Sequence, residues 1–149
     1  VVVKAAGNAG VAIGSTNSAG NKDFLTLALA GTQSAIYVGA LTTNGPVANP
    51  AGLASYSNRA GTNTAIQSHF LVVGVDSSKT GMAGTSFAAP IISGYAAILG
   101  SKFTTATPTQ ITNQLLNTAR KDTLLNYNAA TYGMGEASLS RALAPLTIR

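Results

Sequence analysis

Apolar residues along this chain gather in short runs that stretches rich in glycine, asparagine and proline keep apart. Three of these runs have the length and the β-branched content of buried strands, at residues 1–5, 34–41 and 69–76. Turn-forming residues follow the first two runs, as "GNAG" and as "TTNGPVANPAG". The pattern therefore predicts three strands separated by loops.

The second half of the chain carries helix signals. The longest predicted helix runs from about Ser86 to Gly100, where small residues allow close packing and Pro90 lies near enough to the start that its missing N–H costs little. Thr107 as the cap and Pro108 at the first position mark another helix, and a short amphipathic one is expected from about Ser138. Strands alternating with helices favour an α/β domain around a parallel sheet.

Composition and charge exclude several classes of protein. With 149 residues, 46% hydrophobic and 9% charged, the chain has the size of one packed domain and the wrong composition for disorder. Its formal charge of +5 comes from scattered lysines and arginines, so we expect no nucleic-acid partner. The apolar run from Phe87 to Leu99 is shorter than the about 20 residues that span a bilayer.

The sequence also predicts neither a metal nor a cofactor. It has no cysteine, which excludes disulfides, thiolate nucleophiles and cysteine-ligated zinc. Its four acidic residues form no dense cluster of the kind that binds calcium.

Ser86 stands where "GMAGTSFAAPIISGYAAIL" turns from glycines into an uncharged apolar helix. A serine at a helix start is most often the N-cap, and the residues alone leave that interpretation open. The alternative is chemical. Free N–H groups and positive potential at a helix N-terminus stabilise a developing oxyanion, which is what an attacking serine hydroxyl needs beside it.

The run "GTSFAAP", with "IISGYAAIL" after it, resembles the serine-containing motif of the subtilisin-like serine proteases, the subtilase or peptidase S8 family. A second segment, "VVVKAAGNAG", is similar to the strand and Gly-Asn turn that precede it in the family, and "AIYVGAL" and "LASYSNRAG" resemble the segments between. This resemblance implies an α/β, parallel-sheet subtilisin-like fold, with residues 1–149 as roughly the C-terminal half of one peptidase domain. The family's Ala-Pro-Gly is replaced by "VVG" at 72–74, and Ile91 stands where a histidine is frequent, changes that packing tolerates.

The resemblance also assigns roles to residues. Ser86 matches the nucleophile that forms the acyl-enzyme with a peptide substrate, and Asn8 matches the asparagine whose side-chain amide completes the oxyanion hole. Ala5, Ala6 and Gly7 match a wall of the pocket for the residue before the scissile bond. Without the resemblance, Asn8 would be interpreted as an ordinary turn asparagine beside glycine.

The family's aspartate and histidine precede the asparagine in chain order, and no residue here matches them. The lone His69 is interpreted as a strand-edge residue rather than the base, and Asp23 and Asp76 are equally weak candidates for the orienting carboxylate. We therefore expect an N-terminal portion of the same protease, carrying the aspartate and histidine, as the partner. The isolated chain is expected to be inactive.

Two other functions remain open. An inactive subtilisin-like fragment or passenger module would keep the fold and bind without cutting, whereas an α/β-hydrolase reading of "GTSFA" lacks a histidine after the serine. The tail "YGMGEASLSRALAPL" resembles the end of bacterial autotransporter protease domains. Together with the absence of cysteine, it favours a secreted or cell-surface protein.

Overall fold

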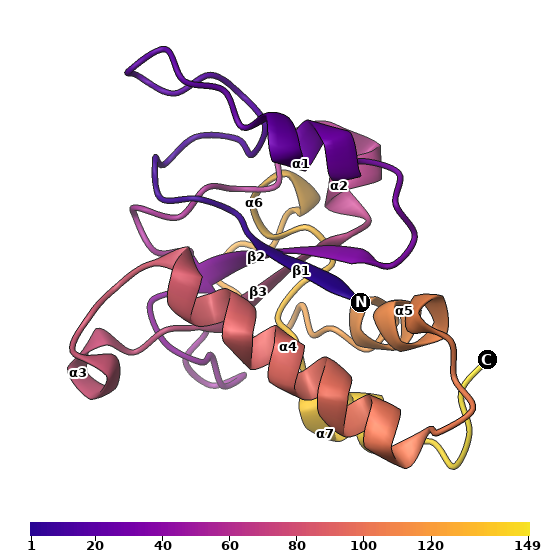
Figure 1. Cartoon of the computed structure of the whole chain (residues 1–149). Coiled ribbons are helices and arrows are strands. Elements are labelled where there is room, and N and C mark those ends of the chain that lie inside the picture. The colour runs from indigo at the N-terminus through magenta and orange to yellow at the C-terminus, as the bar shows by residue number, and fades with distance from the viewer.

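The computed structural model describes all residues, 1–149, around a three-stranded parallel sheet (Figure 1). The strands β1 (Val2–Ala5), β2 (Ala35–Leu41) and β3 (Phe70–Gly74) lie side by side in that order. Val3 lies opposite Ile36, and Tyr37 lies opposite Phe70. The predicted strands and the α/β parallel-sheet fold are confirmed, with β3 ending at Gly74 rather than at 76.

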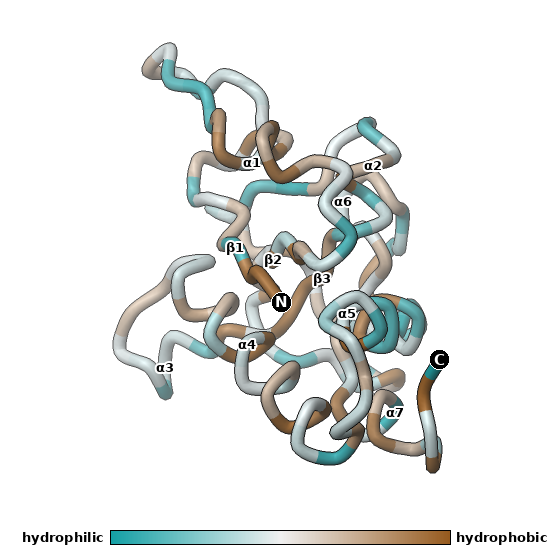
Figure 2. The backbone as a smooth tube through the Cα atoms, turned by 45° about the vertical axis from the view of Figure 1, so that its right-hand side comes forward, coloured by the Kyte–Doolittle hydropathy of each residue, from teal (hydrophilic) through white to brown (hydrophobic).

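The helices cover both faces of this sheet, and α4, α5 and α7 lie on the opposite side from α1, α2 and α6 (Figure 1). Because successive side chains of a strand point to opposite faces, each strand contributes to two cores. Ile36, Val38 and Leu71 face the cluster that includes Ile92 and Leu115, whereas Tyr37, Leu41 and Phe70 belong to the other cluster. The strands form a hydrophobic centre between the two helical layers (Figure 2).

The predicted helices form close to their expected bounds. They are α4 (Thr85–Lys102), α5 (Pro108–Asn117) and α7 (Leu139–Leu143). Thr107 caps α5 through a capping box with Gln110, and Ser138 caps α7. None of the helices combines the length and the apolar character that crossing a membrane requires.

The expectation for Pro90 was wrong. With α4 beginning at Thr85, Pro90 is its sixth residue and lies inside the helix. A residue at this position would donate its N–H to the carbonyl of Ser86, four residues earlier, and proline has no N–H to give. The missing bond is therefore an interior one.

Four further helices were not predicted, namely α1 (Phe24–Leu29), α2 (Thr64–Gln67), α3 (Ser77–Thr80) and α6 (Ala129–Tyr132). Each begins after an aspartate or asparagine whose side chain accepts a hydrogen bond from the first turn; these caps are Asp23, Asn63, Asp76 and Asn128. These helices of four to six residues are too short to show an apolar period by themselves, whereas α7, of similar length, was predicted from a longer amphipathic segment.

Candidate active site

The candidate site lies where the chain leaves the carboxyl end of β1 and where α4 begins. Gly7 follows the buried Ala6 and has a φ of 105°, a left-handed value that favours glycine. A Cβ on Gly7 would also stand 2.6 Å from Nδ2 of Asn58. This turn brings the next residue, the exposed Asn8, to the N-terminus of α4.

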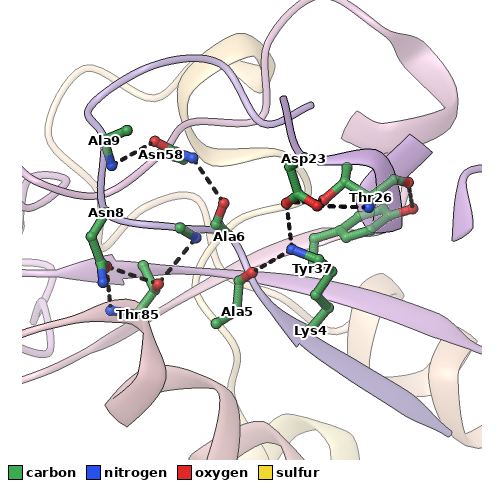
Figure 3. Close-up of polar contacts among 11 residues, drawn as sticks. Lys4, Ala5, Ala6, Asn8, Ala9, Asp23, Thr26, Tyr37, Asn58 and Thr85 are labelled. Atoms are coloured by element: carbon green, nitrogen blue, oxygen red, sulfur yellow. Dashed lines mark hydrogen bonds and ion pairs between the residues drawn. The ribbon is translucent and has the colours of Figure 1, made fainter. Parts of the chain in front are cut away.

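Three hydrogen bonds join this turn to Thr85, the first residue of α4 (Figure 3). The backbone N–H of Thr85 donates to Oδ1 of Asn8 at 2.8 Å, and the Thr85 hydroxyl donates to the same oxygen at 2.9 Å. The Thr85 hydroxyl oxygen in turn accepts from the N–H of Gly7 at 3.1 Å. Thr85 is only 1% exposed, so these bonds are shielded from competing water.

These contacts fix which way the amide of Asn8 points. A backbone N–H can only donate, so the atom of Asn8 that faces Thr85 is the oxygen, and the NH₂ group is left without a partner in the chain. That nitrogen lies beside Gly84, where an added Cβ would be 3.5 Å from it. The site therefore presents an exposed amide donor at the start of α4.

Ser86 is the second residue of α4 and is exposed. The N-cap is Gly84, which provides no side-chain hydrogen bond, so the interpretation of Ser86 as the helix cap is wrong. Neither the hydroxyl nor the backbone N–H of Ser86 forms a hydrogen bond within the chain. The nucleophile candidate and a free backbone donor thus share one residue, next to the Thr85 that binds Asn8.

A cavity of about 270 Å³ lies beside the Gly7 turn, and no residue of α4 lines it. Ala6, Gly7 and Asn8 line it, and Ala5 does not. Ala5 belongs to β1, and its carbonyl accepts a hydrogen bond from the Lys4 ammonium at 3.1 Å. Of the predicted pocket residues, Ala6 and Gly7 are therefore placed at a cavity, while the substrate-binding role of all three stays a prediction.

His69 lies far from Ser86. It immediately precedes β3, and its Nδ1 lies 2.8 Å from the carbonyl oxygen of Ala35 at the amino end of β2. The Asn8 turn is at the carboxyl edge of the same parallel sheet, and strands rise about 3.3 Å per residue. The histidine thus lies at the opposite edge of the sheet, as expected for a strand-edge residue.

The two aspartates that were weak candidates for the orienting carboxylate, Asp23 and Asp76, are the N-caps of α1 and α3. Asp76 accepts hydrogen bonds from the hydroxyl and the N–H of Ser78, and these lower the pKa of its carboxyl. Burial alone would raise the pKa of Asp23, but hydrogen bonds from Lys4 and Thr26 outweigh it and leave the pKa below its ordinary value. The Lys4 ammonium and the Asp23 carboxylate form an ion pair at 2.5 Å (Figure 3).

The sequence did not identify the partner that orients Asn8. Thr85 was noted only within the motif "GTSFAAP", because nothing local to either residue indicates a contact across 77 positions. Asn58 was likewise noted only within a resembling loop, although its side chain contacts the segment around Asn8.

Comparisons with known proteins bear on the family and the fold. The chain matches the model of the Subtilase family over residues 1–135. No curated protein sequence matches it. Among solved structures, it is similar to the patellamide maturation protease PatA, with 24% identity and a TM-score of 0.62, covering 93% of this chain and 48% of PatA.

Two further solved structures share the fold. Fervidolysin from Fervidobacterium pennivorans, a keratinolytic enzyme related to subtilisin, has 24% identity and a TM-score of 0.63 over 98% of this chain and 23% of its own. The epidermin leader peptide processing serine protease EpiP from Staphylococcus aureus has 20% identity and a TM-score of 0.61 over 96% of this chain and 40% of its own. The chain thus spans at most about half the length of these three proteins. Because the family match extends over most of its residues, the chain belongs to the subtilase family.

Proposed function

We propose that this chain supplies the nucleophile and the oxyanion hole of a serine endopeptidase. The observation that carries the proposal is the fixed amide of Asn8, whose NH₂ group is left free at the N-terminus of α4 by the two hydrogen bonds from Thr85. A developing oxyanion is stabilised by free hydrogen-bond donors that are already oriented before the reaction. Removal of one such donor lowers kcat by about 10²–10³-fold.

In the proposed reaction, Oγ of Ser86 attacks the carbonyl carbon of a peptide bond and passes its proton to a histidine. The carbonyl oxygen becomes negatively charged and accepts hydrogen bonds from the Asn8 amide and from the free N–H of Ser86. The same histidine then protonates the leaving amine, the peptide bond breaks, and the acyl group remains on Ser86 as an ester. Water hydrolyses this ester and restores the serine.

We propose that the residue before the scissile bond enters the cavity beside the Gly7 turn. Ala6 and Gly7 line it and contribute no long side chain, which leaves room for a substrate side chain. Ala5 does not line the cavity, and in this proposal it contributes as part of the strand that positions Ala6 and Gly7.

The histidine and its aspartate come, in this proposal, from another portion of the same protease. Seven exposed positions on α4 recur at the spacing of one helix face, and none of these seven is charged; they are Ser86, Pro90, Ser93, Gly94, Ala97, Ile98 and Ser101. The exposed Lys102 is the last residue of the helix. This uncharged stripe begins at the candidate nucleophile. A segment that covered it would therefore lie next to Ser86.

Two further features support the same partner. β1 is an edge strand with no neighbour on one side, and Val2 at that edge is 46% exposed. Phe24 and Leu25 of α1 are 72% and 59% exposed. An unpaired strand edge beside exposed apolar side chains favours a further strand with its own apolar core as the occupant. We call this chain together with that portion the assembled protease.

We also propose that the assembled protease works outside the cytoplasm, at the cell surface or as a secreted enzyme. The chain has no cysteine and is rich in alanine, glycine, serine and threonine, which suits export. The resemblance of its C-terminal segment to autotransporter passengers favours a bacterial outer-membrane route. Cell fractionation with an antibody against residues 1–149 tests this, and a purely cytoplasmic signal contradicts it.

The function is tested by intact-mass spectrometry after treatment with a fluorophosphonate, which labels activated serines. In the assembled protease we expect one adduct, located on Ser86 by peptide mapping, and neither the adduct nor peptide cleavage in the Ser86→Ala variant. Ser93→Ala is the matched control, because Ser93 is an exposed serine on the same helix whose hydroxyl donates to the carbonyl of Ala89.

The isolated chain should remain unlabelled, since it provides no histidine near Ser86. Cleavage that survives Ser86→Ala would contradict the proposal. An assembled protein that binds peptides with neither labelling nor cleavage would support the alternative, a passenger or binding module that keeps the fold without the chemistry.

A further inference from the structure

Asn58 lies in the segment between β2 and α2, and its side chain is directed at the turn that carries Asn8 (Figure 3). It is only 7% exposed, and its side chain forms three hydrogen bonds within the chain. Nδ2 donates to the carbonyl of Ala6 at 2.9 Å, while Oδ1 accepts from the N–H groups of Ala9 and Val11, both at 3.1 Å. The side-chain oxygen has both acceptor positions engaged, and one of the two N–H groups of Nδ2 is donated.

These bonds bracket Asn8 in the sequence. One partner precedes it and two follow it, and the backbone N–H of Asn58 adds a bond to the carbonyl of Gly7 at 2.8 Å. By contrast, neither the N–H nor the carbonyl of Asn8 itself forms a hydrogen bond. The position of the Asn8 backbone therefore depends on its neighbours, and Asn58 holds the neighbours on both sides.

Asn58 is itself held from the sheet. The N–H of Ala40 in β2 donates to the Ser57 hydroxyl oxygen at 3.0 Å, and that hydroxyl donates to the carbonyl of Asn58 at 3.0 Å. Hydrogen bonds thus run without interruption from the central strand through residues 57 and 58 to the turn. Side chains that are fixed to a strand in this way keep a functional site at a defined geometry.

We infer that Asn58 is a positioning residue for the oxyanion hole: it fixes the backbone on both sides of Asn8, so that the free amide of Asn8 meets the developing oxyanion. The inference rests on the proposed function. Thr85 orients the Asn8 side chain, and Asn58 orients the backbone that carries it, so both are needed to place the amide nitrogen. A displacement of about 1 Å at such a position is enough to lower the rate by up to 10²-fold.

The test uses the assembled protease with a chromogenic peptide substrate and the variants Asn58→Ala and Asn58→Asp. We expect Asn58→Ala to lower kcat on the order of tenfold or more, because the oxyanion donor acts only in the transition state. A change in KM would report the cavity that Asn58 also lines. Asn58→Asp keeps the two acceptor contacts but places a carboxylate oxygen against the carbonyl of Ala6 in place of the donor, so we expect it to lower kcat as well. Unchanged kcat in both variants overturns the inference.

A double-mutant cycle with Asn8→Ala separates positioning from a general effect on folding. If Asn58 acts through Asn8, Asn58→Ala lowers kcat by less than about twofold once Asn8 is already alanine. Equal loss in the two backgrounds overturns the inference. Asn58→Asp completes the same cycle if the alanine variant does not fold.

The matched control is Asn128→Ala. Asn128 also binds backbone through its side chain, as the cap of α6, but it belongs to the other end of the chain. We expect a lower Tm with kcat unchanged. Failure of the inference is distinguishable from failure of the proposed function: in the first case Ser86→Ala abolishes cleavage while Asn58→Ala does not reduce it, and in the second Ser86→Ala itself retains cleavage.

Discussion

Oδ1 of Asn8 accepts two hydrogen bonds from Thr85, one from the backbone N–H at 2.8 Å and one from the hydroxyl at 2.9 Å. Both donors belong to the residue before Ser86. A single buried threonine therefore links the start of the long helix, the orientation of the Asn8 amide and the position of the candidate nucleophile.

Thr85→Val removes the hydroxyl at nearly constant volume and leaves the N–H of Gly7 without an acceptor. We expect the assembled protease to lose about 1–3 kcal/mol of unfolding free energy, the usual cost of an unsatisfied buried donor. We also expect kcat to fall by about tenfold, less than the 10²–10³ lost when an oxyanion donor is removed, because Thr85 N–H still holds Asn8. Urea unfolding of the assembled protease that carries Ser86→Ala measures the effect on stability. Steady-state kinetics of the protease with Ser86 intact measures the effect on kcat.

Thr85→Ser is the matched control for this experiment, since it keeps the oxygen and loses only a methyl group. It should retain most of kcat. Native kcat in Thr85→Val would show that the hydroxyl does not orient Asn8.

Gly7→Ala should be strongly destabilising for two separable reasons. The φ of 105° disfavours any residue with a Cβ, and that Cβ would stand 2.6 Å from Nδ2 of Asn58. Gly20→Ala isolates the first reason, because Gly20 has a φ of 80° and no atom within 4 Å of the added Cβ. Left-handed backbone costs a non-glycine residue about 1–2 kcal/mol.

Thermal or urea unfolding of the two variants measures the difference between them. We expect Gly7→Ala to cost more than Gly20→Ala and, in addition, to lower kcat, because the displaced Asn58 no longer holds the turn. Equal losses of stability with native kcat would contradict this.

Local patterns in the sequence were sufficient for the strands and the longer helices. An apolar run of adjacent residues predicts β1, and the sequence Thr-Pro-x-Gln that begins at Thr107 predicts the cap of α5. The position of Pro90 was misjudged, because only the first four N–H groups of a helix lack a partner, and Pro90 lies beyond them whether the helix begins at Ser86 or at Thr85.

The residues of the candidate site were likewise predicted only where a local pattern indicates them. Ser86 and Asn8 were found because each lies in a contiguous motif that resembles a known family. The contacts that place them were not found, since Thr85 and Asn58 reach the Asn8 turn across 77 and about 50 residues, and only the folded chain brings them together. The secondary-structure propensity of a residue does not indicate which distant residue its side chain contacts.

The ion pair between Lys4 and Asp23 predicts a loss of stability in acid. The carboxyl of Asp23 has a pKa below its ordinary 3.8, so it binds a proton more readily in the unfolded chain. Its contribution is complete above the unfolded pKa and is lost as the pH falls through the lower native value. Asp23→Asn should therefore cost about 1–2 kcal/mol at pH 7 and flatten this part of the stability profile.

Urea unfolding between pH 7 and pH 2 measures this profile. Asp122→Asn is the control, because its ion pair with Arg120 is exposed and should contribute nothing resolvable. If Asp23→Asn and the native chain lose stability in parallel as the pH falls, the ion pair is not the cause.

Glu136 leads to a prediction of opposite sign. It is 7% exposed, with Oε1 accepting from the N–H of Gly45 at 3.2 Å and Oε2 accepting from the Thr123 hydroxyl at 2.5 Å. Burial raises the pKa of this carboxyl above 4.5, although these hydrogen bonds and the charge of Arg120 oppose the shift. The native chain therefore holds the Glu136 proton more tightly than the unfolded chain does.

A raised native pKa means that Glu136 favours the folded state below the unfolded pKa and that this contribution is lost as the pH rises through the native value. Glu136→Gln keeps the shape and the acceptor for Gly45, and Thr123 can accept from the new amide instead of donating. We expect Glu136→Gln to be as stable as the native chain or more stable at pH 8, and to lack the native decline as the pH rises above 4.5. Urea midpoints at intervals across this range test it, with Thr123→Val as the variant that should lower the midpoint at every pH by leaving Oε2 unpaired. A decline that persists unchanged in Glu136→Gln would assign the pH dependence to other groups, of which Tyr95, Arg120 and Asp122 lie within the electrostatic reach of this carboxyl.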